Sequence, residues 1–166
     1  MILFFIFTSY TSSLYPQGAE TYLRNPGSGK RITVAYIVHE LEVTDSIFLK
    51  DIDSLLLDSD CPYLKNSANK YFALYITKSN KNSEHYNLVI ALYPVPIAEY
   101  GNTGYFEYKG YTFFVDENEI VTLFKRKNNK KEFTYKRGEY RVTEEFPMWV
   151  FSYKNQRLTL LESTCW

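Results

Sequence analysis

Short runs of β-branched and aromatic residues, separated by polar connections, fill the chain from Tyr71 to its end. Such residues fit the pleated, half-buried surface of a sheet, and short polar connections are typical of turns between strands. The expected strands cover residues 71–77, 86–93, 105–108, 111–115, 120–125, 131–136, 148–153 and 157–161. Because consecutive strands joined by tight turns run antiparallel, this pattern predicts a β-meander.

Four two-residue connections in this region should form hairpin turns: Lys109-Gly110, Glu117-Asn118, Asn128-Asn129 and Asn155-Gln156. Gly and Asn tolerate the positive φ that two-residue hairpins demand, so three of the four have the expected turn chemistry. The Glu117-Asn118 pair is compatible with a turn as well. We therefore expect the chain to reverse direction at all four positions.

One earlier strand and one helix are expected ahead of the meander. Residues 31–38 are rich in β-branched side chains and predict a strand that continues toward Val43. Thr44 or Asp45 can then cap a helix with an apolar face at i, i+4, i+7 and i+8, made by Phe48, Ile52, Leu55 and Leu56. The sequence thus predicts an α+β fold: a mostly antiparallel β-meander sheet with one amphipathic helix packed on it. A strongly curved or partly closed sheet is one form that this meander can take.

Alternation along two strands indicates which side chains face the core. Trp149, Phe151 and Tyr153 share one face of their strand, and the other face also carries apolar groups, so this strand should lie inside the sheet. Phe133 and Tyr135 alternate with charged and polar residues, which is typical of a strand with one wet face.

The N-terminal residues 1–19 contain no charged side chain and begin with an apolar block at residues 2–7. An apolar start followed by small polar residues is typical of a secretion signal, although this block is short and no basic residue precedes it, as in a truncated signal. We expect a signal-like segment at 1–19, a flexible connector at 20–30 and a single β-rich domain at 31–166. The protein would then be periplasmic or secreted; alternatively, residues 2–7 form a buried strand of a cytoplasmic protein.

Two cysteines, Cys61 and Cys165, lie far apart in the sequence. In an oxidising compartment a disulfide between them would close a long loop and stabilise the fold. If the protein stays in the cytosol, two unpaired thiols are expected instead. The cysteine prediction therefore depends on the export prediction.

The sequence lacks the spacing of common catalytic motifs. Val43 stands where a zinc-protease helix that begins at His39 needs its second histidine. The chain has only two histidines, His39 and His85, so a three-histidine metal site is excluded, and we expect neither a metal nor a cofactor. A small hydrolase that uses Glu40 and Glu42, neighbours on one strand face, with a histidine is the enzymatic alternative.

Charge is segregated along the chain, although 19 basic and 19 acidic side chains balance overall. Residues 39–60 hold seven acidic side chains and one basic one, whereas residues 125–141 hold eight basic and two acidic ones. Such runs also occur on solvated faces and hairpin tips, but they can steer a partner of opposite sign.

The overall neutrality argues against a nucleic acid partner, and no apolar stretch is long enough for a transmembrane span.

These observations favour a non-catalytic exported binding module that recognises a protein or an extended ligand through an aromatic and basic sheet face. The expected binding residues are Lys125, Arg126, Lys127, Lys130, Lys131, Phe133, Tyr135, Tyr108 and Tyr111. Beside the hydrolase, a second alternative is a toxin-neutralising, immunity-type protein whose acidic segment at residues 39–60 masks a basic site.

Export predicts a processed N-terminus. Mass spectrometry of the protein from its native source should find a mature chain that begins after about residue 13 to 19, because signal peptidase cuts behind the apolar block. An intact Met1 in a soluble cytosolic fraction would show that the block is part of a cytoplasmic protein.

Overall fold

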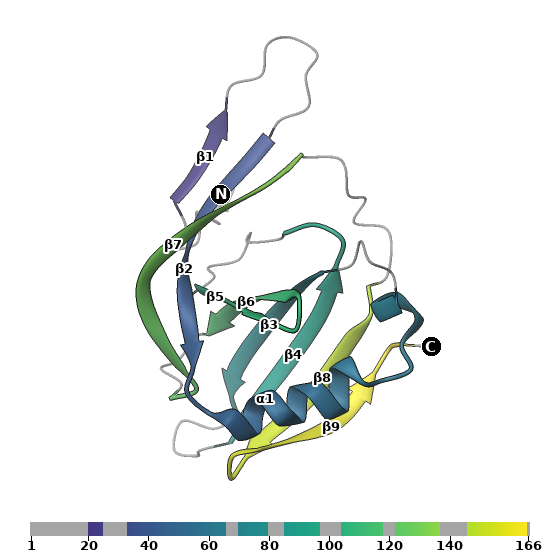
Figure 1. Ribbon diagram of the computed structural model, residues 1–166. Helices are drawn as coiled ribbons and strands as arrows, with labels where there is room; N and C mark the ends of the chain where they lie inside the picture. The colour runs from purple at the N-terminus through teal and green to yellow at the C-terminus, as the bar shows by residue number, and fades with distance from the viewer. Residues whose placement is uncertain are drawn as a thin grey trace, which may run out of the picture.

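The computed structural model describes residues 20–24, 33–65, 70–79, 85–96, 104–117, 122–136 and 146–165. Within these ranges the chain forms nine strands, one helix and a short 3-10 turn at Pro62–Lys65 (Figure 1). The strands are β1 (Glu20–Arg24), β2 (Thr33–Val43), β3 (Tyr71–Lys78), β4 (Tyr86–Tyr93), β5 (Gly104–Tyr108), β6 (Tyr111–Glu117), β7 (Phe124–Lys136), β8 (Met148–Lys154) and β9 (Arg157–Ser163). The helix α1 spans Ser46–Ile52 and continues as a π-helical turn over Asp53–Leu57.

The sheet is open and mixed, in the order β1-β2-β5-β6-β3-β4-β8-β9, and β7 pairs with β2 outside this path. The α+β class is confirmed, but the antiparallel meander is only partly right, because β2 pairs with β5 and β3 pairs with β6 in parallel. Turn residues indicate where the chain reverses direction, but they do not determine which distant strand pairs with the free side of a hairpin. Here β8 pairs with β4, and β6 pairs with β3.

The predicted hairpin turns have different outcomes. Lys109 (φ 49°) and Gly110 (φ 84°) join β5 to β6, and Asn155 (φ 52°) and Gln156 (φ 60°) join β8 to β9, so both turns are confirmed. The turn at Asn128-Asn129 is wrong, because β7 runs through it as one strand of 13 residues. Asn118 lies outside the described residues, although β6 does end at Glu117.

The Asn128-Asn129 pair instead meets an irregularity in the β2–β7 ladder. The antiparallel register shifts between His39 and Leu41, directly opposite this part of β7. The Asn129 side chain donates a hydrogen bond of 3.2 Å to the Glu40 carboxylate. The Asn128-Asn129 pair therefore lies at a β-bulge within a long ladder and not in a turn.

The strand predicted near residues 31–43 is β2, and β1 pairs with it in antiparallel register. Residues 20–24 were expected to belong to a flexible connector, but they form strand β1. The signal-like segment at 1–19 and the remainder of the connector lie outside the described residues.

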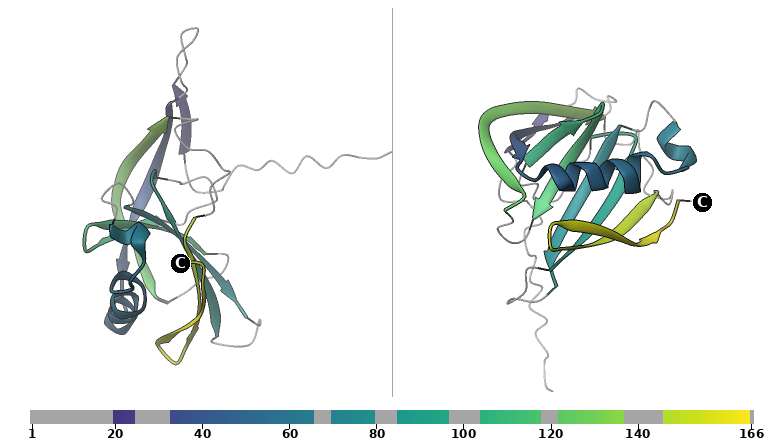
Figure 2. Two further views of the ribbon diagram at one scale, coloured as in Figure 1. Left: turned by 90° about the vertical axis from the view of Figure 1, so that its right-hand side faces the viewer. Right: turned by 60° about the horizontal axis from the view of Figure 1, so that its bottom comes forward.

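The amphipathic helix forms as its sequence predicts. Asp45 caps it, since its Oδ1 accepts hydrogen bonds from the backbone N–H of Ile47 (2.8 Å) and Phe48 (3.3 Å). Phe48, Ile52 and Leu56 are fully buried against one face of the sheet, which α1 crosses in Figures 1 and 2. No helix in the described part of the chain is long and apolar enough to cross a membrane.

Two hydrophobic clusters lie on opposite faces of the main sheet. The larger cluster, under α1, includes Trp149, Phe151 and Tyr153, which are buried on one face of β8 as alternation predicts. Strand β8 lies between β4 and β9, inside the sheet. The smaller cluster joins the β2–β7 pair to the other face through Val34, Val38, Tyr105, Phe114, Phe133 and Tyr135.

The two cysteines form a disulfide, as predicted for an oxidising compartment. Cys61 follows the helix and Cys165 follows β9, with 5.6 Å between their Cα atoms. The bond connects the C-terminal end of the helical segment to an edge strand that is 104 residues away in the sequence.

Reduction of the Cys61–Cys165 disulfide should lower the free energy of unfolding by about 4 to 5 kcal/mol, because the unfolded chain regains the freedom of a long loop. Urea denaturation with and without reductant measures the change. In a Cys165→Ala variant, the reductant should have no further effect. Equal urea midpoints for the oxidised and reduced wild-type protein would contradict a stabilising bond.

Candidate functional site

The predicted basic residues lie on β7, a long strand at the edge of the fold (Figures 1 and 2). It pairs with β2 on one side, and no other described strand pairs with it. Six basic side chains and one acidic side chain fall within its 13 residues. Lys125, Arg126, Lys130 and Lys131 are exposed, and Lys127 is half-buried. The structure therefore brings these five predicted residues together on one edge strand.

The aromatic residues of the predicted binding face point into the core instead. Phe133 is only 6% exposed and Tyr135 only 9%. The Phe133 ring packs edge-on against the rings of Tyr105 (5.0 Å between centroids) and Phe114 (4.8 Å). Alternation correctly predicted one solvent-exposed face on this strand. That face carries the charged residues, whereas the aromatic residues lie on the buried face. Phe133 and Tyr135 are thus core residues and are not available to a ligand.

Tyr108 and Tyr111 lie on β5 and β6, on either side of the β5–β6 turn, and Tyr108 lines a cleft together with Lys127 of β7. Both are half-buried against the larger hydrophobic cluster. The Tyr111 hydroxyl donates a hydrogen bond of 3.3 Å to the carbonyl oxygen of Leu64. These tyrosines therefore do not extend the basic surface.

Two lysines of β7 are held by carboxylates from neighbouring strands. The Lys127 Nζ lies 2.6 Å from Oε1 of Glu40 on β2, and the Lys131 Nζ lies 2.5 Å from Oε1 of Glu107 on β5. Lys131 also lies over the ring of Phe133, 5.2 Å from its centroid. These contacts attach β7 to the sheet, so only part of its charge is directed outward.

The ion pairs stabilise the charged forms of their members. Hydrogen bonds from Lys127 and Asn129 lower the pKa of the Glu40 carboxyl group. The hydrogen bond to Glu40 raises the pKa of Lys127, and the hydrogen bond to Glu107 raises the pKa of Lys131. Among the described residues, no ion pair involves Lys125 or Lys130. These two exposed lysines are the charges on β7 best placed to meet a partner.

A cleft of about 430 Å³ opens between β2 and β5, close to these ion pairs. The two parallel strands pair at a single position, Glu40 with Tyr105. Ten residues line the opening: Glu40, Leu41, Glu42, Val43, Leu49, Tyr105, Phe106, Glu107, Tyr108 and Lys127. The sequence suggested Glu40, Glu42, Tyr108 and Lys127, but for different roles. Tyr105, Glu107 and the apolar lining were missed, because only the parallel β2–β5 pairing brings them here.

The residues of the hydrolase alternative are only partly brought together. Glu40 and Glu42 both line the cleft, whereas neither histidine does. His39 alternates with Glu40 along β2, and its Nδ1 is buried without a hydrogen-bond partner among the described residues. His85 Nε2 lies 2.7 Å from the Ser152 hydroxyl. No histidine is therefore placed to act with the two glutamates.

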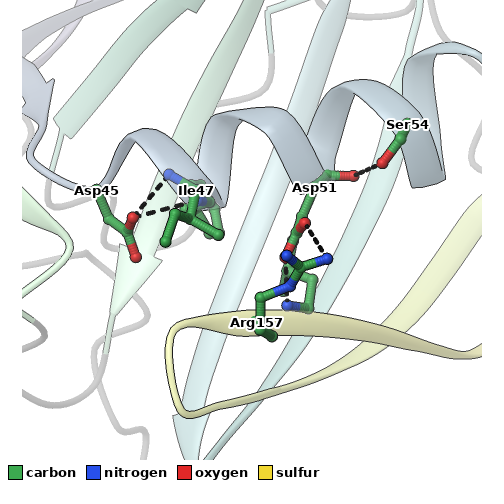
Figure 3. Close-up of polar contacts among 7 residues, drawn as sticks. Asp45, Ile47, Asp51, Ser54 and Arg157 are labelled. Carbon is green, nitrogen blue, oxygen red and sulfur yellow. Dashed lines mark hydrogen bonds and ion pairs between the residues drawn. The ribbon is translucent and has the colours of Figure 1, made fainter.

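Several residues of the acidic segment hold the helix in place (Figure 3). Asp51 is only 3% exposed; its Oδ2 accepts a hydrogen bond of 2.8 Å from the Leu158 N–H, and its Oδ1 lies 3.1 Å from Arg157 Nη2. Besides capping the helix, Asp45 accepts a hydrogen bond of 2.8 Å from the Tyr153 hydroxyl. Burial, together with this bond, raises the pKa of Tyr153.

Asp53 completes this group, since it forms an ion pair with Lys109 in the β5–β6 turn. Three of the seven acidic side chains in residues 39–60 thus connect the helix to strands, and Glu40 binds Lys127. The sequence offered a signal only for the capping role of Asp45.

No protein-family model, curated protein or solved structure matches this chain. Within the described ranges, no three His, Cys, Asp or Glu side chains are grouped so that they could hold a metal ion. A function therefore has to be inferred from the edge strand and the cleft themselves.

Removal of the Lys127 ammonium should raise the pKa of Glu40 toward the ordinary glutamate value of about 4.3. In the folded protein this pKa is lowered, so the Glu40 contribution to stability is present above the ordinary pKa and is lost as the pH falls through the folded one. A carboxyl-detected NMR titration of wild type and Lys127→Met measures both midpoints. Lys130→Met removes an equal charge nearby and should leave the Glu40 midpoint almost unchanged. An unshifted midpoint in Lys127→Met would mean that the ion pair is not formed in solution.

Proposed function

We propose that this protein is a non-catalytic, exported binding module that holds an acidic, extended segment of a partner protein along strand β7. The main supporting observation is that a strand of 13 residues, with six basic side chains and one acidic one, pairs with another described strand on one side only. An open strand edge presents backbone N–H and C=O groups at the spacing that another extended chain requires.

The side chains of β7 favour a partner other than a second copy of this chain. Lysines on an open edge oppose one another when two identical strands approach, and proteins commonly use this repulsion to prevent edge-to-edge aggregation. The same lysines attract a segment that carries Asp or Glu. Lys125 and Lys130 are exposed and form no ion pair in the described part of the chain, so a partner can neutralise them without breaking an internal contact.

Export of the module is supported by two features of the chain. Disulfides persist in oxidising compartments and are rare in the cytosol, and Cys61 pairs with Cys165. The uncharged residues 1–19 suit a secretion signal. Periplasmic or secreted placement accounts for both features.

The hydrolase is the second candidate, favoured by the presence of Glu40 and Glu42 in one cleft. Glycoside hydrolysis needs one protonated carboxyl group as a general acid. The lowered pKa of Glu40 makes this residue unsuitable for that role, and no histidine lines the cleft. If the protein is a hydrolase, Glu40→Gln should abolish turnover of a glycoside or ester substrate, whereas Lys130→Glu on β7 should leave turnover unchanged.

The immunity-type alternative has less support. Asp45, Asp51, Asp53 and Glu40 are already bound by groups of this chain, so the acidic segment presents fewer charges to a partner than its sequence indicates.

Reversal of two free charges on β7 should weaken the binding of an acidic extended peptide. The probe is a fluorescein-labelled peptide of ten residues with alternating Glu and Thr, measured by anisotropy at low and high salt. Lys125→Glu with Lys130→Glu should lower the affinity by on the order of tenfold, since two contacts of up to about 1 kcal/mol each are lost and replaced by repulsion. The difference should shrink as salt screens the charges.

The matched control is Lys70→Glu with Lys154→Glu, which makes the same charge change at two exposed lysines outside β7. A second probe with the same charges but alternate N-methylated backbone groups tests strand addition, because it cannot complete the backbone hydrogen bonds. Equal loss of affinity in both double variants, or undiminished binding of the methylated peptide, would contradict recognition along β7.

A further inference from the structure

Strand β9 is another open edge of the sheet, and its side chains differ from those of β7. It ends the strand order beside β8, and no other described strand pairs with it (Figure 2). Two of the three exposed large apolar side chains in the described part of the chain lie on β9: Leu160 is 39% exposed and Leu161 is 60% exposed. This edge therefore presents apolar surface where β7 presents lysines.

The pairing of β9 with β8 leaves Leu161 outside the ladder. Leu160 lies opposite Phe151 and Glu162 lies opposite Val150, so Leu161 is an extra residue with no partner on β8. Proteins commonly protect an edge strand with a bulge or with charged side chains. Here the extra residue of the bulge is itself an exposed leucine, whose apolar atoms gain free energy when a partner removes them from water.

The backbone of β9 is open to a partner near Leu160 but not at the start of the strand. The Leu158 N–H points away from β8, since it donates a hydrogen bond of 2.8 Å to Oδ2 of Asp51 on α1. Backbone groups alternate in direction along an antiparallel strand, so the N–H and C=O of Leu160 point away from β8 as well. Asp51 thus occupies the first open position, and Leu160 is the next one along the edge.

Both ends of this edge are held in place by the rest of the protein. At the start, Asp51 contacts Arg157 as well as the Leu158 N–H (Figure 3). At the end, the Thr164 N–H donates a hydrogen bond of 2.9 Å to the Met148 carbonyl oxygen, and Cys165 is bound to Cys61. An edge that is already ordered loses little conformational entropy when a partner binds to it.

The charges on β9 favour a second copy of this chain as that partner. If a two-fold axis passes through Leu160, the Arg157 end of each strand lies beside the Glu162 end of the other. The Arg157 side chain is 67% exposed although its Nη2 contacts Asp51, and a guanidinium group has further N–H donors for a second carboxylate. Glu162 is exposed and forms no ion pair among the described residues.

We infer that β9 joins two copies of this chain in an antiparallel dimer. Leu160 and Leu161 of each copy pack against those of the other, and Arg157 lies beside Glu162 of the partner subunit. The contact involves one short strand from each copy, so the dimer is weak, with a Kd on the order of 100 µM. This inference does not depend on the function proposed for β7, because the lysines that oppose a second copy lie on a different strand.

The first test is sedimentation velocity of the full chain at concentrations from about 10 µM to about 1 mM, which bracket the expected Kd. The average mass should rise from that of the monomer toward twice that value. Methyl NMR spectra over the same range should show shifts at Leu160 and Leu161 but not at Thr134 on β7. A monomer at every concentration would overturn the inference.

Leu161→Lys should raise the Kd at least tenfold, because it removes an apolar contact and brings like charges together across the axis. Thr134→Lys adds the same charge at an exposed position on β7 and should leave the Kd unchanged. A dimer that persists in Leu161→Lys, or that Thr134→Lys weakens equally, would overturn the inference. Binding of the acidic peptide on β7 should be unaffected by Leu161→Lys, which separates this test from that of the proposed function.

Glu162→Arg gives an independent measurement that keeps all three leucines of the strand. It places a second cation beside Arg157 of the partner subunit and should raise the Kd about fivefold. Glu162 is exposed, so the fold should be preserved, as backbone spectra of all three variants will show. An unchanged Kd in a folded Glu162→Arg variant would contradict the antiparallel arrangement.

Discussion

The close approach of two backbones at Gly104 connects the two parts of this sheet. A Cβ at this position would lie 2.5 Å from Leu41 Cγ and 2.7 Å from the carbonyl oxygen of His39. Only glycine allows β5 to come this near β2 without displacement of the backbone, so the contact depends on one missing side chain. Without it, the β1–β2–β7 group would lose its parallel connection to the main sheet, and the cleft would lose one wall.

The brevity of this connection explains why charged side chains matter to the fold. Because β2 and β5 pair at only one position, Glu40 with Tyr105, the backbone alone holds the two strands together weakly. The Lys127–Glu40 and Lys131–Glu107 pairs attach β7 to both strands, and the small hydrophobic cluster around Phe133 buries the apolar side of the same junction. Lys127 and Lys131 thus have a structural role, whereas Lys125 and Lys130 form no ion pair within the part of the chain that the structure describes.

Local patterns predicted the elements of this fold but not their neighbours. The helix, its cap at Asp45, the β8 face with Trp149 and the turn at Lys109-Gly110 all depend on residues close in sequence, where propensity and alternation act. The β3–β6 pairing and the bulge at Asn129 depend on which distant strand lies alongside, which no local signal specifies. The candidate cleft belongs to this second group, since its two walls meet only through a parallel pairing.

The role of each charged run likewise depends on the helix and strands that lie next to it in the fold. The acidic segment supplies a helix cap at Asp45 and two anchors at Asp51 and Asp53, so three of its seven carboxylates hold the helix in place. In the basic run, Lys127 and Lys131 form ion pairs, whereas Lys125 and Lys130 form none among the described residues. Unpaired lysines on an edge strand repel an identical edge strand, whereas they attract an acidic segment. If β7 binds an acidic segment as proposed, its unpaired lysines would both oppose a second identical edge and favour that partner.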